Sequence, residues 1–245
     1  MQAVILAAGS SRRLRPLTDN TPKCLLNIRD KNLLHRTIEN VTDYGIDEFI
    51  FVTGYLENMI KDYLNENFPD LKMTFITNPG YENNNNSYSL WMTKDFVKND
   101  ILLLDSDILF DKKIIGKLLD SSHENCLAVN FTNDLDEEQI KVILDKKNKV
   151  LEIGKEISIS KSAGESIGIE KFSTYFMKEL FLILDRKISK ENIINEFYEA
   201  SFQEVIDNND NSDHGNSIYA EDVGMFGCME IDTVSDYEKA QSIII

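Results

Sequence analysis

A chain of 245 residues, of which 42% are hydrophobic, is long and apolar enough to bury a substantial core, which excludes a disordered tail. The formal net charge of −16 argues against nucleic acid as a partner, because proteins that bind the phosphate backbone need clustered positive charge. Three cysteines at wide spacing, Cys24, Cys126 and Cys228, suit reduced thiols better than a disulfide framework or a zinc site. With no signal-peptide pattern and no run near about 18 apolar residues, we expect a cytoplasmic protein that does not bind membranes.

The first half of the chain alternates short apolar runs with amphipathic stretches, a pattern typical of βαβα folds with a mostly parallel sheet. A buried strand over residues 2–8 ends at Gly9. The predicted elements that follow are a helix through Leu34, Ile38 and Val41 that ends near Gly45, a strand at 48–53, a helix at 56–64 and a strand at 71–77.

A polar loop at residues 78–86 comes next, and Ser87 can cap a short helix. The strand at 100–104 then delivers Asp105, Ser106 and Asp107 at its carboxyl end. Open α/β sheets bind their ligands at such ends, so we expect functional groups here.

The second half reads as α+β. Its predicted elements are a hairpin of strands at 140–144 and 150–153, a strand at 167–172, helices at 175–184 and 193–206, and a solvated loop at 207–213. No linker divides the chain, so we expect one domain over residues 1–245. The predicted fold class is α/β, a Rossmann-like three-layer αβα sandwich with a mixed, mostly parallel sheet and a smaller α+β part in the second half.

The most informative segment covers residues 6–25, which read LAAGSSRRLRPLTDNTPKCL. Gly9 lets the backbone approach a phosphate closely, while Arg13 and Lys23 can neutralise its charge. The segment therefore predicts a polyanionic ligand. Neither GxxxxGK[ST] nor GxGxxG is present, which removes the main support for P-loop and dinucleotide enzymes.

This segment resembles the signature loop of the nucleotidyltransferases that activate sugar phosphates and phosphocholine, LAAGxGxRLxPLTxxxPKxL. The matching positions are Gly9, Arg13, Leu14, Pro16, Leu17, Thr18, Pro22 and Lys23. Ser11 departs from the glycine that is usual in the family, and a positive φ would strain a serine there. The resemblance implies Arg13 and Lys23 as catalytic residues, and a nucleotide site formed by Leu6, Ala7, Ala8, Gly9, Ser10, Ser11, Asn84, Asn85, Ser89 and Asp105.

The same resemblance extends to two aspartates. LLLDSD at residues 102–107 is similar to the family strand that ends in a metal ligand, here Asp107, and MEIDTVSDYEKAQ at 229–241 to the closing segment that supplies a second, here Asp232. Two carboxylates and a triphosphate are sufficient for Mg²⁺, the implied cofactor. The alternative for Asp232 is to cap the last helix.

Two further stretches, TNPGYENNNNSYSLWM at 77–92 and AGESIGIEKFS at 163–173, resemble the branch that uses CTP and phosphocholine or related phospho-amino compounds. Tyr81 and Trp91 are expected to offer aromatic faces, and Glu165 a carboxylate, to a cationic acceptor, although Trp91 also suits the core. Lys155 is the candidate for the acceptor phosphate, with Lys141 as the alternative.

Together these features predict Mg²⁺-dependent transfer of CMP from CTP to the phosphate or phosphonate of a small amine-bearing acceptor, with release of pyrophosphate. Phosphocholine is the leading acceptor, ahead of phosphoethanolamine and 2-aminoethylphosphonate. Residues 1–130 would bind the nucleotide, and residues 131–245 the acceptor. The alternatives are a sugar-1-phosphate nucleotidyltransferase that uses UTP, dTTP, GTP or CTP, and an inactive nucleotide-binding regulator. A homo-oligomer is left open.

Overall fold

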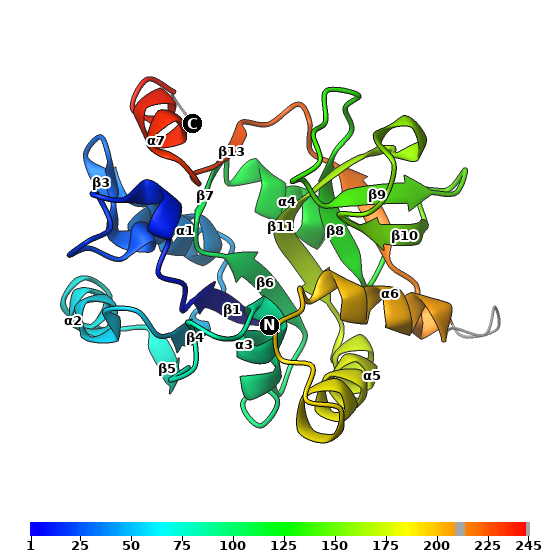
Figure 1. Cartoon of the computed structure of the whole chain (residues 1–245), viewed down its shortest axis with the longest axis horizontal. Coiled ribbons are helices and arrows are strands. Elements are labelled where there is room, and N and C mark those ends of the chain that lie inside the picture. Colours follow the sequence, from blue (N-terminus) through cyan, green and yellow to red (C-terminus); the bar gives the residue numbers. More distant parts are fainter. Residues whose placement is uncertain (209–213, 244–245) are drawn as a thin grey trace.

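The computed structural model of the chain describes residues 1–208 and 214–243. Nine of the described strands form one central sheet with helices on both faces (Figure 1). Its first-half strands are all parallel: β1 (Gln2–Ala7), β4 (Glu48–Thr53), β5 (Lys72–Thr77) and β6 (Ile101–Asp105). Its second-half strands are β8 (Cys126–Asn130), β9 (Lys141–Leu144), β10 (Val150–Gly154), β11 (Gly164–Phe172) and β12 (Tyr219–Asp222).

The order β10-β9-β11-β6-β1-β4-β5 joins the two halves of the chain, because β11 pairs antiparallel with β6. β8 pairs with β11 and β12, and β9 with β10 forms the predicted hairpin. Two short pairs lie outside this sheet, β2 (Asn27–Ile28) with β3 (Lys31–Asn32) and β7 (Ile108–Phe110) with β13 (Cys228–Glu230).

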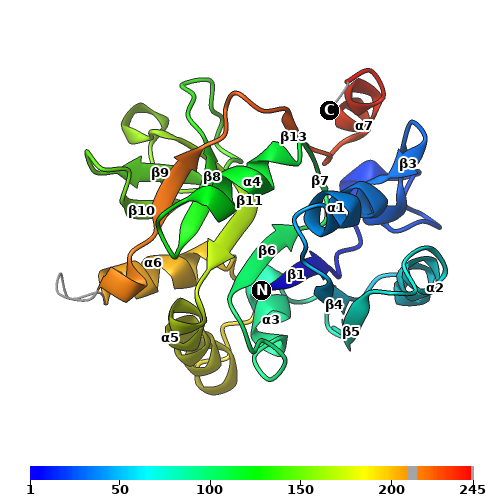
Figure 2. The same cartoon turned by 180° about the vertical axis from the view of Figure 1, so that it is seen from behind.

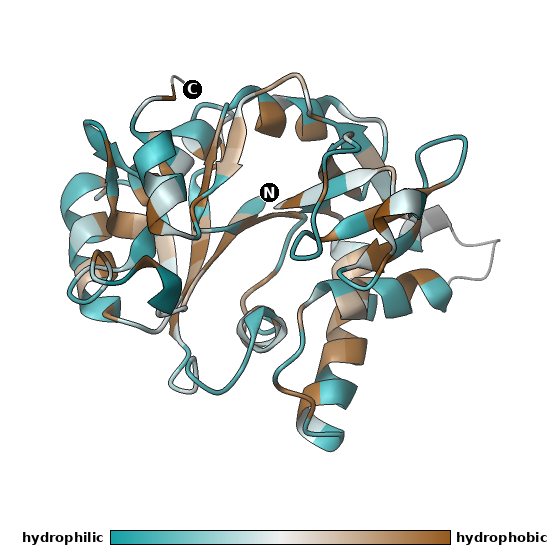
Figure 3. Cartoon of the chain, turned by 45° about the horizontal axis from the view of Figure 1, so that its top comes forward, coloured by the Kyte–Doolittle hydropathy of each residue, from teal (hydrophilic) through white to brown (hydrophobic). Residues whose placement is uncertain are grey.

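The described α-helices are α1 (Leu33–Thr42), α2 (Glu57–Asn67), α3 (Asn86–Met92), α4 (Lys113–Asp120), α5 (Thr174–Asp185), α6 (Glu199–Asp207) and α7 (Val234–Ala240). They cover both faces of the sheet. Successive side chains of β1 point to opposite faces, so each face has its own hydrophobic cluster. Val4 packs in one core cluster with residues of α3, α5 and α6, and Ile5 in another with residues of α1, α2 and α4. Figure 3 shows hydrophobic residues along the central strands and hydrophilic ones on the loops around them. The predicted fold class is confirmed.

The helix predicted at 193–206 is wrong in its first half, because α6 begins only at Glu199. Asn192 has a left-handed backbone with φ of 57°. The carbonyl of Ile194 accepts a hydrogen bond from the Asn85 amide, and the amide of Tyr198 donates to Oδ1 of Asn86. These tertiary bonds to the start of α3 replace the helical ones.

The capping prediction at Ser87 is also wrong: Asn85 caps α3, and its Oδ1 accepts from the Asn86 amide. Of the loop predicted at 207–213, residues 209–213 lie outside the described residues. The three cysteines are free thiols. Among the described helices, none combines the length and the apolar character that crossing a membrane requires.

The C-terminal helix packs against a segment from the first half of the chain. α7 lies next to the segment that contains β3 and α1, as both views of the molecule show (Figures 1 and 2). A small third core cluster joins Leu14, Leu109, Ile231 and Ala240, which belong to four separate segments. Packing of Leu14 against Ile231 brings their neighbours, Arg13 and Asp232, to the same place.

Candidate active site

A side-chain hydrogen bond within the loop after β1 fixes the position of Ser11. Thr18 is fully buried, and its Oγ1 donates to the carbonyl of Ser11 at 2.9 Å. Ser11 is left-handed, with φ of 47°, so the strain foreseen for a serine at this position is present. A Cβ on Gly9 would meet no described heavy atom within 4 Å, so its backbone faces open space. The loop is therefore open to a ligand on the side of Gly9.

Lys23 lies between two aspartates that are distant in sequence. Its Nζ is 2.8 Å from Oδ2 of Asp107 and 2.7 Å from Oδ1 of Asp232. Arg13 approaches Asp232 from the other side, with Nη2 2.5 Å from Oδ2. The Lys23 side chain is only 8% exposed, so its charge acts in a poorly hydrated place.

A third carboxylate, Glu230, joins this pair. The candidate oxygens of Asp107, Glu230 and Asp232 lie within 4.8 Å of one another, an arrangement of hard oxygen donors that suits a divalent cation. Desolvation, reinforced by the charges of Asp107 and Asp232, raises the pKa of Glu230 to about 8. Burial alone would lower the pKa of Lys23, but the two aspartates outweigh burial and raise it.

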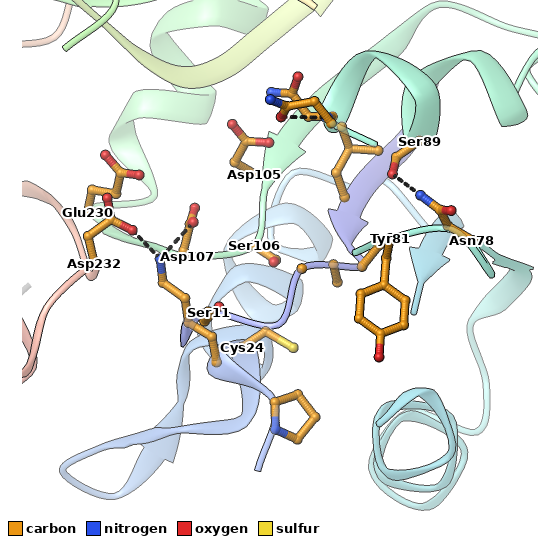
Figure 4. A pocket seen from close by; sticks show the side chains of 18 of the residues that line it. Ser11, Cys24, Asn78, Tyr81, Ser89, Asp105, Ser106, Asp107, Glu230 and Asp232 are labelled. Carbon is orange, nitrogen blue, oxygen red and sulfur yellow. Dashed lines mark hydrogen bonds and ion pairs between the residues drawn. The ribbon is translucent and has the colours of Figure 1, made fainter. Parts of the chain in front are cut away.

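These groups border a cavity of about 290 Å³ at the carboxyl ends of β1 and β6. Figure 4 shows Asp107, Glu230 and Asp232 at one end of it, and Asn78, Tyr81 and Ser89 at the other. Of the residues predicted to bind the nucleotide, all but Ser10 line this cavity: Leu6, Ala7, Ala8, Gly9, Ser11, Asn84, Asn85, Ser89 and Asp105.

An asparagine network shapes the far end of this first cavity. Asn78 is fully buried, and its Nδ2 donates to Oδ1 of Asn84 at 2.8 Å and to Oγ of Ser89 at 3.0 Å. Asn84 donates back to Oδ1 of Asn78 at 3.1 Å. The asparagines therefore fix one another first, and offer a ligand only their remaining donors and acceptors.

A second cavity, of about 560 Å³, adjoins the first. Arg13, Asp105, Asp107, Glu230 and Asp232 border both. The remaining acidic side chains that line the second cavity are Asp136, Glu138, Glu165, Glu199 and Asp236, and its only basic ones among the described residues are Arg13 and Lys155. Acidic groups therefore outnumber basic ones along its walls.

The structure separates the two lysines considered for the acceptor phosphate. Lys155 lines the second cavity, where its Nζ lies 3.2 Å from Oε2 of Glu138 and 4.8 Å from the ring centre of Phe197. Lys141 is 1% exposed and donates to the carbonyls of Asp136, Glu137 and Gln139, so it holds the loop before β9 instead.

Both aromatic residues expected at the acceptor lie elsewhere. Tyr81 borders the first cavity, beside Tyr55 at a centroid distance of 6.3 Å. Trp91 lines neither cavity: its Nε1 donates to Asp185 at 3.1 Å, and it packs against the core cluster under α5. Ser89 lines the first cavity, and Trp91, two positions later on the helix α3, therefore lies on a different face of the helix.

Sequence reasoning missed Glu230, Phe197 and Glu199, all of which line the second cavity. Glu230 is two residues before Asp232, so the alternation of a strand was a usable signal for it. Phe197 and Glu199 carried none, because the stretch around them reads as ordinary amphipathic helix.

Buried carboxyl groups lie behind the cavity wall, and they give stability a pH dependence. Glu170 on β11 is 1% exposed, its Oε2 has no hydrogen-bond partner among the described residues, and burial raises its pKa well above the ordinary value. A carboxyl whose pKa is raised by folding stabilises fully below its unfolded pKa, and that stability is lost as the pH rises through the folded pKa. The wild-type protein should therefore lose stability as the pH rises above about 4 on account of this group.

Glu170→Gln, which cannot ionise, should be more stable than wild type at pH 8 by on the order of 1 kcal/mol or more, and the two should converge toward pH 4. Urea unfolding at a series of pH values measures the difference. Glu152→Gln, at an exposed position on β10, is the control. Parallel curves for wild type and Glu170→Gln would show that Glu170 does not resist ionisation.

The chain belongs to the nucleotidyl transferase family, whose model, described as Nucleotidyl transferase, matches residues 2–138. This confirms the resemblance seen in the loop after β1 and the enzyme class that it implies. CTP:phosphoglutamine cytidylyltransferase of Campylobacter jejuni is 30% identical, over 97% of this chain and 98% of its own. Choline-phosphate cytidylyltransferase of Streptococcus pneumoniae is 27% identical, over 100% of this chain and 98% of its own.

Solved structures agree. That of CTP:phosphocholine cytidylyltransferase from Streptococcus pneumoniae superposes with a TM-score of 0.80 at 26% identity, over 98% of this chain and 97% of that one. The inositol-1-phosphate CTP transferase of T. maritima gives 0.79 at 21% identity, over 98% and 94%, and shows the shared fold.

Proposed function

We propose that this nucleotidyltransferase transfers the cytidylyl group of CTP to the phosphate or phosphonate of a small amine-bearing acceptor. The observation that carries the proposal is the acidic second cavity, which meets the first at Arg13, Asp107 and Asp232. Negative walls favour a cationic head group, whereas a neutral sugar would need paired hydrogen-bonding groups. Relatives named for CTP with phosphocholine or phosphoglutamine support the same nucleotide and the same kind of acceptor.

In the proposed reaction, an oxygen of the acceptor phosphate attacks the α-phosphorus of CTP. The new P–O bond forms as the bond to the β-phosphate oxygen breaks, and pyrophosphate leaves with the electron pair. An ionised phosphate needs no general base, so catalysis is positioning and charge neutralisation. The backbone of residues 9–11 would cradle the triphosphate, and Arg13 and Lys23 would neutralise charge that grows during transfer.

Mg²⁺ is the proposed cofactor. Asp107, Glu230 and Asp232 would hold it, because they offer three carboxylates with oxygens close together. When bound, it would supply charge neutralisation on the phosphate oxygens. Lys23 contacts two of these carboxylates, so its ammonium is in place to balance their charge.

The proposed division of labour follows the two cavities. Residues 1–130 supply most of the first, which we assign to the nucleotide, and residues 131–245 supply most of the second, which we assign to the acceptor. We expect Lys155 to bind the acceptor phosphate after its ion pair with Glu138 breaks, so that the phosphate replaces the Glu138 carboxylate as its anionic partner.

Pyrophosphate release across a panel of substrates tests the proposal. CTP, UTP, dTTP and GTP are each combined with phosphocholine, phosphoethanolamine, 2-aminoethylphosphonate and glucose 1-phosphate, with and without Mg²⁺. We expect turnover with CTP and the amine-bearing acceptors, abolished by chelation. Faster turnover with glucose 1-phosphate would make the protein a sugar-phosphate enzyme, and binding without turnover would make it a regulator.

Glu165→Gln should lower kcat/KM for the amine-bearing acceptors about tenfold, because one carboxylate facing a desolvated cation is lost. Glu165 lines the second cavity and not the first, so KM for CTP should stay nearly unchanged. Steady-state kinetics with each substrate varied in turn measures both. Glu221→Gln, on β12 and paired with Lys117, is the control. An equal effect on CTP and acceptor would remove Glu165 from acceptor binding.

A further inference from the structure

Glu199 is a buried carboxyl group in the wall of the second cavity. It is the first residue of α6 and is 6% exposed. One of its oxygens, Oε2, is enclosed and has no hydrogen-bond partner among the described residues, and no described cation forms an ion pair with the group. A buried carboxylate is costly, so the group needs either a proton or a cation supplied by a ligand.

The surroundings of Glu199 disfavour its ionised form. Burial raises the pKa of Glu199 to about 7, and Lys155, the cation that acts on it, is turned toward Glu138. Behind it Glu170 also has an Oε2 without a partner among the described residues. A bound cation with N–H groups would satisfy Glu199 and neutralise it at the same time.

The aromatic content of the second cavity points the same way. A trimethylammonium group has no N–H and is recognised by aromatic faces. Phe197 is the one aromatic side chain among the described residues that line this cavity, and the Nζ of Lys155 already lies over its ring. Tyr81 and Trp91 lie outside this cavity, as described above. The cavity therefore offers hydrogen-bond acceptors rather than an aromatic cage.

Building on the proposed function, we infer that the acceptor carries an ammonium group with at least one N–H, and that the carboxylate of Glu199 in the cavity wall accepts its hydrogen bond. The enzyme then selects primary amines over fully methylated ones. This reverses the order expected from the sequence, in which phosphocholine led. Glu199 becomes the specificity-determining residue, while Glu165 contributes negative charge that does not distinguish the two head groups.

A methylation series separates these possibilities. The series consists of phosphoethanolamine, its N-methyl and N,N-dimethyl derivatives, and phosphocholine. All four share the phosphate and the linker, and they differ in how many N–H groups are replaced by methyl groups. With saturating CTP, kcat/KM should be similar for the three acceptors that keep an N–H and at least about tenfold lower for phosphocholine, the scale of one hydrogen bond to a charged group. Equal or better use of phosphocholine overturns the inference.

Glu199→Gln tests the residue. It should remove most of the preference for phosphoethanolamine, through a loss on that substrate, while KM for CTP stays within about twofold. Glu204→Gln, on the same helix but paired with Arg186, should keep the wild-type preference. Glu199→Asp, which keeps the charge on a shorter side chain, should retain part of it. A parallel loss on all four acceptors in Glu199→Gln would show a merely structural role and overturn the assignment.

The outcome also separates this inference from the proposed function. Turnover of phosphocholine and phosphoethanolamine at the same rate contradicts the role of Glu199 but leaves cytidylyl transfer to amine-bearing acceptors intact. Turnover of glucose 1-phosphate alone contradicts both.

Discussion

Lys23→Ala should turn over about a hundredfold more slowly than wild type, because loss of one charge-neutralising contact in a water-poor site costs on the order of 3 kcal/mol. The Lys23 ammonium contacts Asp107 and Asp232 and is almost fully buried, so solvent cannot replace it. Pyrophosphate release at saturating substrates measures the loss in kcat. Circular dichroism checks that the variant is folded, because removal of the Lys23 ammonium leaves Asp107 and Asp232 without the cation that they share.

Lys94→Ala is the matched control for this substitution. Lys94 also forms an ion pair, with Nζ 2.6 Å from Asp185, but it lines neither cavity. Its kcat should equal that of wild type. Near-normal turnover in a folded Lys23→Ala variant would take Lys23 out of the mechanism.

Asp107→Asn and Asp232→Asn should each lower turnover by on the order of a hundredfold to a thousandfold, and the double variant should be little worse than either. Both carboxylates belong to one proposed Mg²⁺ site and share Lys23, so loss of either already disables the unit. Rates of the three variants over a range of Mg²⁺ concentrations measure the coupling, and the single variants should need more Mg²⁺ for half-maximal rate.

Asp222→Asn is a suitable control, because Asp222 lies at the end of β12 and borders neither cavity. Losses that multiply in the double variant, with an unchanged dependence on Mg²⁺, would mean that the two aspartates act separately.

The sequence predicts well what short-range patterns determine. The loop after β1 is a contiguous motif, so Gly9, Arg13 and Lys23 could be predicted together as parts of one site. The predicted end of strand β6 placed Asp105, and Asp107 two residues later, at the carboxyl ends of the parallel strands. Asp232 lies 209 residues from Lys23, and it could be joined to the site only because the closing segment resembled a known one.

Tertiary hydrogen bonds account for much of what the sequence did not predict. Residues 193–198 have helical periodicity, but the bond from Tyr198 to Asn86 spans 112 residues, and no local pattern encodes it. Trp91 has an aromatic face on a helix near the cavity, yet the Asp185 carboxylate holds its indole on the opposite side. Glu199 is one acidic residue among many, and only its burial in the cavity wall, which the fold creates, singles it out.

The two cavities draw their distinguishing walls from different stretches of chain. The first depends on the loop after β1 and the asparagine network, while Gln139, Lys155, Glu165 and Glu199 border only the second. In the proposed assignment of the cavities, substitutions at these four positions would change which molecule receives the nucleotide and leave the loop after β1 unaltered. Recipient choice and transfer chemistry would then be separately adjustable within one continuous sheet. A new product would be accessible through a few single substitutions, without any intermediate that has lost the groups proposed for transfer.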